Sequence, residues 1–176
     1  DRTYRRISTF FTKGMVGHVG LADPICKELA KTVVVASKKA GATVHEGGTY
    51  ICIEGPQFST RAESILYRQW GVDVIGMTNV TEAKLAREAG ICYSTVALAT
   101  DYDCWHTGHD SVTLEAVLEI MHKNVAMAQT IVKEAVAKLK NGRTCNCGDA
   151  AKFAIVTDKK KTPPALKKKL QVLFGK

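Results

Sequence analysis

Asp101 and Asp103 lie one residue apart, directly after an apolar run of the chain. Residues 91–99 are nearly uncharged, and their apolar side chains predict a buried strand that ends at these carboxylates. Carboxylates beside a core are usually paired or used, because an isolated charge is costly to bury. Ligands of open α/β sheets bind at the carboxyl ends of strands. The two acids could therefore hold a metal ion, or they could share the reading and protonation of a base.

The same two acids also have a purely structural interpretation. If Asp101 points into a cleft, Asp103 would orient it or favour its protonated form by like-charge repulsion. Alternatively, the pair forms an Asx turn and caps the helix that follows. The residues alone do not decide between these two roles.

A second candidate segment joins an expected strand to an expected helix at residues 55–63. Gly55-Pro56 is typical of a turn, and Thr60 followed by Glu63 predicts a capping box. Phe58 either packs into the core or presents its ring beside the start of the helix, where a flat base could stack on it. Taken alone, the segment favours the packing role.

Met77 and Thr78 end another expected strand, at residues 72–77. A methionine here is typical of a core, and a threonine is typical of a helix cap. In a strand–helix–strand unit, however, this position also offers backbone N–H groups and a hydroxyl to an anion.

The order of expected elements predicts an α/β fold. Strand, helix and strand follow one another within about thirty residues, which implies parallel neighbouring strands. A long amphipathic helix then follows, before an irregular segment and a terminal helix. The expected strands are 43–53, 72–77 and 91–99, and the expected helices are 23–40, 60–70, 81–89, 112–140 and 163–173.

Composition is that of a globular domain, with 176 residues, 45% hydrophobic and 24% charged. The net charge is +8, but much of the excess lies in the last eighteen residues, and no nucleic-acid-binding motif accompanies it. We therefore expect no nucleic-acid partner. The absence of a membrane-length apolar run and of a signal-peptide pattern predicts a cytoplasmic protein without a membrane partner.

The six cysteines are scattered along the sequence. Cys26, Cys52 and Cys92 lie in apolar surroundings and are expected to pack as small hydrophobic residues. Cys145 and Cys147 form a pair, but they lack the C-x-x-C spacing and the partner pair of a zinc site. No metal site is predicted.

Taken together, these motifs resemble the trimeric purine nucleoside phosphorylases, and among them the branch that acts on 5′-methylthioadenosine. The resemblance extends from residue 1 to about residue 142. It rests on four segments in order, EGPQFSTRAES at 54–64, WGVDVIGMTNV at 70–80, EAKLAREAGICY at 82–93 and ATDYDCW at 99–105.

The resemblance implies a role for each candidate residue. Asp101 is the general acid, with Asp103 beside it at the base; Phe58 stacks on the purine; Met77 lies under the ribose; and Thr78 contacts ribose or phosphate. Members that act on 6-oxopurines carry Asn at the position of Asp101, so Asp favours a 6-aminopurine. The remaining substrate-binding residues that the resemblance implies are Ser59, Thr100, Leu114, Val117, Leu118 and, from a neighbouring subunit, His18.

The resemblance also implies a fold, a reaction and an assembly. We expect a three-layer α/β/α phosphorylase domain over residues 1–176, with a mixed, partly parallel sheet and with 143–176 as an irregular lysine-rich tail and terminal helix. The family's amino-terminal strands and phosphate loop have no counterpart here. The expected reaction is phosphorolysis of 5′-methylthioadenosine by a homotrimer, with inorganic phosphate as co-substrate and no cofactor. A non-catalytic adenine-nucleoside-binding fragment, part of a split assembly and a 6-oxopurine phosphorylase are the alternatives. In some microbial members, a pair spaced like Cys145 and Cys147 forms a disulfide.

Overall fold

The computed structural model describes residues 1–106, 114–139, 142–158 and 160–174. These residues form two compact units, each built from three separate segments. The first unit comprises Asp1–Tyr4, Lys31–Thr78 and Val96–Lys140; the second comprises Arg5–Ala30, Asn79–Thr95 and Asn141–Lys176. Because the segments alternate along the chain, no linker separates the units in sequence. The single domain with a tail stays a prediction.

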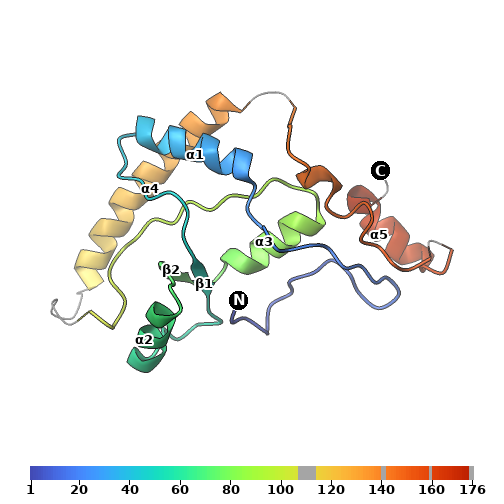
Figure 1. Cartoon of the computed structure of the whole chain (residues 1–176), viewed down its shortest axis with the longest axis horizontal. Helices are drawn as coiled ribbons and strands as arrows, with labels where there is room; N and C mark the ends of the chain where they lie inside the picture. Colours follow the sequence, from blue (N-terminus) through green and yellow to red (C-terminus); the bar gives the residue numbers. More distant parts are fainter. Residues whose placement is uncertain (107–113, 140–141, 159, 175–176) are drawn as a thin grey trace. The chain divides into compact units, whose positions relative to one another are not determined.

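The first unit contains a small parallel sheet. Strand β1 (Tyr50–Cys52) pairs with β2 (Val74–Gly76), and the register places Ile51 opposite Ile75 (Figure 1). Arg2 forms a parallel bridge with Ile53, and its N–H donates to the carbonyl of Cys52 at 2.8 Å. The start of the chain therefore extends the hydrogen bonding on the other side of β1.

Helix α2 (Arg61–Gln69) covers this sheet through Tyr67. Ile51, Ile53 and Tyr67 form a buried cluster, against which half-buried apolar residues of β2 and its flanks pack. The helix begins at the predicted capping box: Thr60 Oγ1 accepts from the Glu63 N–H at 3.2 Å, and the Glu63 carboxylate accepts from the Thr60 N–H at 2.8 Å. Local sequence thus sets where this helix starts.

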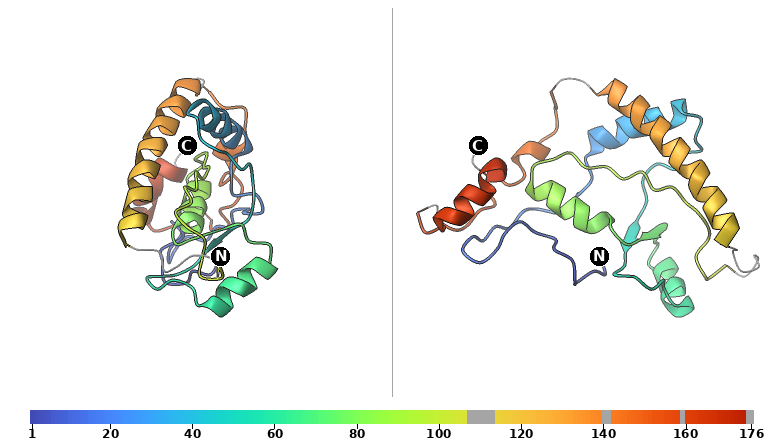
Figure 2. Two further views of the ribbon diagram at one scale, coloured as in Figure 1. Left: turned by 90° about the vertical axis from the view of Figure 1, so that its left-hand side faces the viewer. Right: turned by 180° about the vertical axis from the view of Figure 1, so that it is seen from behind.

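Two longer helices belong wholly or mainly to the first unit. Helix α4 (Leu114–Lys138) confirms the predicted amphipathic helix, and α1 (Lys27–Lys39) lies beside it in both views (Figures 1 and 2). Lys39 Nζ lies 2.7 Å from the Glu134 carboxylate and pairs the two helices. Helix α1 begins three to four residues later than the Asp23-Pro24 pair predicts.

The second unit combines α3 (Asn79–Glu88), a short 3₁₀ turn (Cys147–Asp149) and α5 (Pro164–Phe174). The α3 carboxylate of Glu88 accepts hydrogen bonds from Thr9 Oγ1 and the Phe10 N–H, at 2.7 and 2.6 Å. These bonds hold the early part of the chain against α3. The terminal helix and the irregular segment before it are as predicted.

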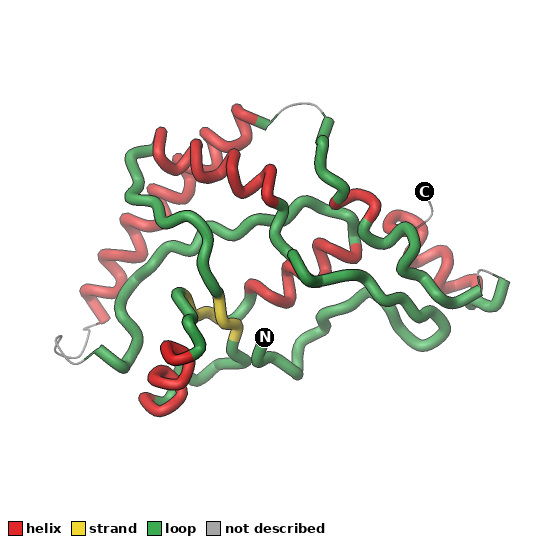
Figure 3. Tube along the Cα trace, in the orientation of Figure 1, coloured by secondary structure: helices red, strands yellow, loops and turns green. Residues whose placement is uncertain are grey.

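The α/β class is confirmed, but the sheet of the described residues is smaller than the sequence predicts. It has two strands, both parallel, and most of the connecting chain is loop (Figure 3). Residues 91–99 do not form a strand, and Ile91 is 58% exposed. Apolar composition predicts burial, but a strand also requires a neighbouring ladder of hydrogen bonds, which this segment lacks in the described part of the chain. Residues 43–49 are not a strand either.

In the described residues, none of the helices combines the length and apolarity that crossing a membrane requires.

The capping box makes the stability of α2 depend on pH. Two hydrogen bonds from Thr60, first from its backbone N–H and then from its hydroxyl, hold the pKa of Glu63 below its ordinary value of 4.5. A carboxyl whose pKa falls on folding stabilises the fold above its unfolded pKa, and this contribution is lost as the pH falls through the folded pKa. We expect Glu63→Gln to reduce the loss of stability between about pH 6 and pH 3, measured by urea unfolding at each pH.

Removing the Thr60 hydroxyl, the other half of the capping box, should lower the stability of the fold at all pH values. Thr60→Ala should cost about 1 kcal/mol of unfolding free energy, because an N-cap hydroxyl is lost. Thr60→Ser keeps the hydroxyl and serves as the matched control. Equal acid sensitivity of the wild type and Glu63→Gln would contradict the role given to this carboxylate.

Candidate functional site

The parallel pairing of β1 and β2 brings the segments that follow them to one edge of the sheet. Gly55 comes shortly after β1, and Met77 directly follows β2. Gly55 has a φ of +67°, and a Cβ added to it would lie 2.6 Å from Met77 Sδ. Glycine is therefore required here both by the backbone conformation and by the close approach of the methionine. The two turns are therefore in contact where they leave the strands.

Phe58 and Ser59 lie in the first of these turns. Phe58 is 87% exposed, so the packing role that its segment favours in isolation is wrong and its ring is available to a ligand. The hydroxyl of Ser59 is buried and has no hydrogen-bond partner in the described residues. A buried hydroxyl without a partner costs free energy, which a polar ligand atom would recover.

The two aspartates occupy the third segment of the site. The exposed Asp101 carboxylate accepts a hydrogen bond from Thr100 Oγ1 at 2.6 Å. The half-buried Asp103 carboxylate accepts from the N–H of the next residue, Cys104, at 2.8 Å, which is a local contact but not the predicted Asx turn. Asp103 therefore braces its own backbone, while Asp101 faces solvent beside a hydroxyl.

Side-chain contacts tie the aspartate segment to the Phe58 turn. Cys104 Sγ donates to the carbonyl of Ser59 at 3.6 Å, and the Arg61 guanidinium donates to the carbonyl of Cys104. Arg68, also from α2, places its guanidinium 3.5 Å from the centre of the Trp105 ring. The start and the exposed face of α2 thus hold residues 103–105 in place, and three segments distant in sequence meet at one edge.

The remaining predicted residues are distributed differently. Thr78 is exposed at the end of β2, and Leu118 on α4 is 44% exposed. Leu114 and Val117 belong to α4, but their side chains lie outside the described part of the structure. His18 belongs to the second unit, where it is exposed and its N–H donates to the carbonyl of Ala154 at 2.8 Å. The other predicted site residues all belong to the first unit.

The sequence analysis missed an apolar groove next to this site. The groove has a volume of about 580 Å³ and runs between α4 and the segment before Asp101. Asn124 of α4 links the two sides of the groove, because its Nδ2 donates to the carbonyl of Ala99 at 3.0 Å. The apolar stripe of α4 can be recognised in the sequence, but the sequence does not show which segment packs opposite it. The groove is lined by Leu98, Thr100, Met121, Asn124, Val125, Ala128, Gln129, Val132 and Lys133.

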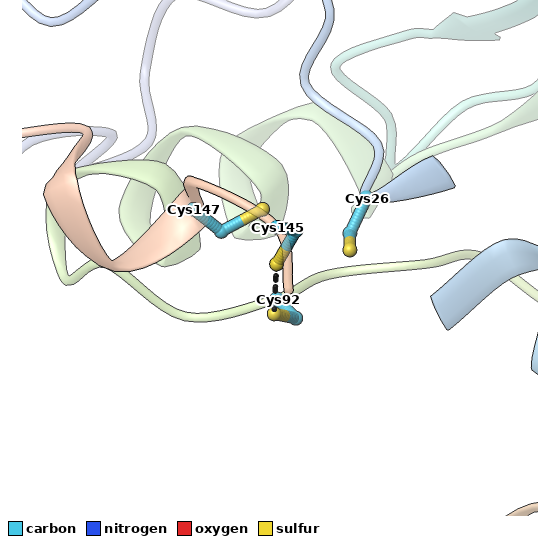
Figure 4. A group of neighbouring side chains, drawn as sticks. All are labelled: Cys26, Cys92, Cys145 and Cys147. Atoms are coloured by element: carbon cyan, nitrogen blue, oxygen red, sulfur yellow. Dashed lines mark hydrogen bonds between the residues drawn. The ribbon is translucent and has the colours of Figure 1, made fainter. Parts of the chain in front are cut away.

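The sequence analysis also missed a group of thiols in the second unit. Cys26, Cys92, Cys145 and Cys147 place all four sulfur atoms within 4.8 Å of one another (Figure 4). Sequence separations of more than fifty residues hide this grouping, and only the Cys145–Cys147 spacing hints at it. Cys52 remains a buried packing residue in β1, as expected.

A parallel α/β unit with aromatic, sulfur-containing and acidic side chains gathered at one edge of its sheet has the arrangement at which open α/β sheets bind ligands. Comparison with known proteins specifies the family. Residues 1–137 match the model of the phosphorylase superfamily. The chain belongs to the phosphorylase superfamily.

Individual relatives are similar over the whole chain. The S-methyl-5′-thioadenosine phosphorylase of Koribacter versatilis is 57% identical over 100% of this chain, and that of Geobacter sulfurreducens is 54% identical over 99%. The chain spans 60% and 62% of the length of these two relatives. A crystal structure of a methylthioadenosine phosphorylase from an antarctic soil metagenomic library has a TM-score of 0.89 and 44% identity, covering 98% of this chain and 62% of that one.

The contacts of Arg61 generate a prediction about the aspartate segment. Arg61→Met removes the donor to the Cys104 carbonyl, which contributes about 1 kcal/mol, so residues 100–105 should open more often. We expect Cys104 to be alkylated roughly fivefold faster, measured by mass spectrometry of the modified peptide. Lys31→Met, which removes a similar charge from α1, is the control. Unchanged alkylation of Cys104 in Arg61→Met would contradict this bracing role.

Proposed function

We propose that this chain carries the nucleoside site of a 5′-methylthioadenosine phosphorylase, a pentosyltransferase of purine and methionine salvage. The observation that carries the proposal is the meeting of the Phe58 turn, Met77 and the Asp101 segment at one sheet edge. Together, these segments can contact a flat base and a ribose, and they can supply a proton donor. Relatives named for this activity, with 54–57% identity over essentially the whole chain, support the proposal.

The purine binds at the first and third segments. The exposed ring of Phe58 stacks on the base, and Ser59 and Thr100 offer hydroxyls to its edge. Asp101 faces N7, while Asp103 holds the backbone of its loop. Adenine presents an acceptor at N7 and a donor at its 6-amino group. A protonated carboxyl matches both, because its hydroxyl donates and its carbonyl oxygen accepts.

The sugar and its 5′ substituent bind at the second segment and beyond it. Met77 lies under the ribose, and the exposed Thr78 hydroxyl contacts ribose or phosphate. The methylthio group meets an apolar wall from the start of α4, formed by Leu114, Val117 and Leu118. His18 reaches this substituent from a neighbouring subunit of a homotrimer. The expected localisation is cytoplasmic, and no membrane or nucleic-acid partner is proposed.

The reaction transfers a pentosyl group from nitrogen to oxygen. The bond from C1′ to N9 breaks with its electron pair going to the base, and a phosphate oxygen forms a new bond to C1′. The transition state has oxocarbenium character, as in glycoside hydrolysis. Adenine is a poor leaving group as an anion, so the Asp101 proton passes to N7 as the bond breaks. The products are adenine and 5-methylthioribose 1-phosphate.

Asp101 is the residue whose removal should be most informative. Asp101→Ala should lower the rate of phosphate-dependent adenine release from 5′-methylthioadenosine by about 10²- to 10⁴-fold, because general acid catalysis is lost. Asp101→Asn should also shift preference towards inosine, since an amide donates to a 6-oxo group. Glu119→Gln, an acid of α4 outside the site, is the control and should change little.

Nucleoside binding, measured by calorimetry with and without phosphate, separates the alternatives. Adenine release that depends on Asp101 supports the proposed activity. A folded chain that binds 5′-methylthioadenosine without turnover would contradict turnover by this chain alone, and would favour a non-catalytic adenine-nucleoside-binding fragment or part of a split assembly. Preference of the wild type for inosine would favour a 6-oxopurine phosphorylase.

A further inference from the structure

The four sulfur atoms of Cys26, Cys92, Cys145 and Cys147, gathered within 4.8 Å of one another, point to a tetrathiolate site for one Zn²⁺ ion. We infer that this metal site, in the second unit, is structural and that it joins three distant segments of the chain. It shares no residue with the nucleoside site and does not depend on the proposed activity.

The spacing of the sulfur atoms fits a single tetrahedral ion. Four thiolates at a zinc–sulfur distance of about 2.3 Å lie about 3.8 Å from one another. In this structure, Cys92 Sγ and Cys145 Sγ are 3.3 Å apart, and no pair exceeds 4.8 Å. All four cysteines are free thiols, and 3.3 Å is far beyond a disulfide bond of about 2.05 Å. Small shifts of these side chains would place all four around one ion.

Backbone N–H groups already point at two of the sulfurs. Cys26 lies immediately before α1, where its Sγ accepts from the Leu29 N–H at 3.5 Å and its carbonyl accepts from Ala30. The N–H of Cys147 donates to the sulfur of Cys145. Such bonds stabilise thiolates, and the start of a helix adds a favourable dipole at Cys26. The surroundings thus suit the charged form of these ligands.

The environment also supplies a counter-charge. Zinc with four thiolates carries a net charge of −2, and the Arg143 side chain contacts Cys92. Arg143 is held there because it donates to the carbonyl of Gly90 at 2.7 Å and packs against Gly148. Gly148 and Gly90 are themselves in close contact, which lets the loop after Cys147 approach the end of α3. This packing holds the Arg143 guanidinium beside the proposed ligand Cys92.

Zinc binding would release the thiol protons to solvent, because the charge of the ion favours the thiolate form of each ligand.

Soft thiolate ligands in a tetrahedral arrangement select zinc among the common divalent ions. A disulfide between Cys145 and Cys147 is the competing outcome for the same residues. The geometry favours the metal, because two sulfurs from other segments, Cys26 and Cys92, complete the set of four.

The test is metal analysis of the purified 176-residue chain, prepared under reducing conditions without chelator. We expect one zinc ion per chain by mass spectrometry of the elements, and X-ray absorption at the zinc edge should show four sulfur neighbours at about 2.3 Å. Replacing zinc by Co²⁺ alone should give the visible absorption of a tetrahedral cobalt tetrathiolate. This part of the test needs no variant, so a variant that fails to fold cannot obscure it.

Variants then assign the ligands. Cys147→Ser and Cys92→Ser should each weaken zinc affinity by about 100-fold or more, and Arg143→Met by about tenfold, as expected for a second-layer partner. Cys104→Ser, a cysteine outside the cluster, is the matched control and should retain one zinc ion. Circular dichroism checks that each variant is folded.

Three results would overturn the proposal. The first is a folded chain with no bound metal in which all six cysteines are reduced. The second is a disulfide that links two of the four cysteines in the chain as purified. The third is zinc that remains bound with unchanged affinity in Cys92→Ser and Cys147→Ser.

Discussion

The parallel pairing of β1 and β2 is the constraint on which the candidate nucleoside site depends. Because Cys52 lies opposite Gly76, the turns that leave the two strands start at the same level of the sheet. Gly55 and Met77 can then touch, and helix α2 starts close enough for Arg61 to hold the Cys104 carbonyl. A shift of one residue in this register would separate the aromatic turn from Met77 and exchange the faces of the strand. Three pairs of residues therefore position the segments that form the proposed base and ribose sites.

Features with a local cause could be predicted from the sequence. The capping box at Thr60 and Glu63, the end of α2 near Gly71 and the length of α4 all follow from residues within a few positions of each other. The residues of the candidate site were chosen from the resemblance of their motifs, although the segment before Asp101 is not the expected strand. The exposure of Phe58 could not be predicted, since packing and ligand contact demand the same aromatic side chain.

Features with a distant cause could not be predicted in this way. The run before Asp101 has the composition of a strand, yet in the described residues it lacks the neighbour that would pair with it. The meeting of Cys26 and Cys92 with the Cys145 pair depends on three segments that no local pattern connects. The groove likewise lies between α4 and residues 98–100, and only the helix has an apolar periodicity that the sequence reveals.

The alternation of segments between the two compact units has a kinetic consequence. The first unit joins the opening four residues to a segment that ends at residue 140, and the second joins Val16 to Thr157 across 141 positions. Forming contacts between residues so far apart first lowers the entropy of the chain, because a long loop must close. The stabilising contacts form only afterwards, so folding is slow. Neither unit can be completed while the chain is still being synthesised up to these points. Until its last segment has been synthesised, each unit leaves apolar segments exposed to chaperones and to aggregation.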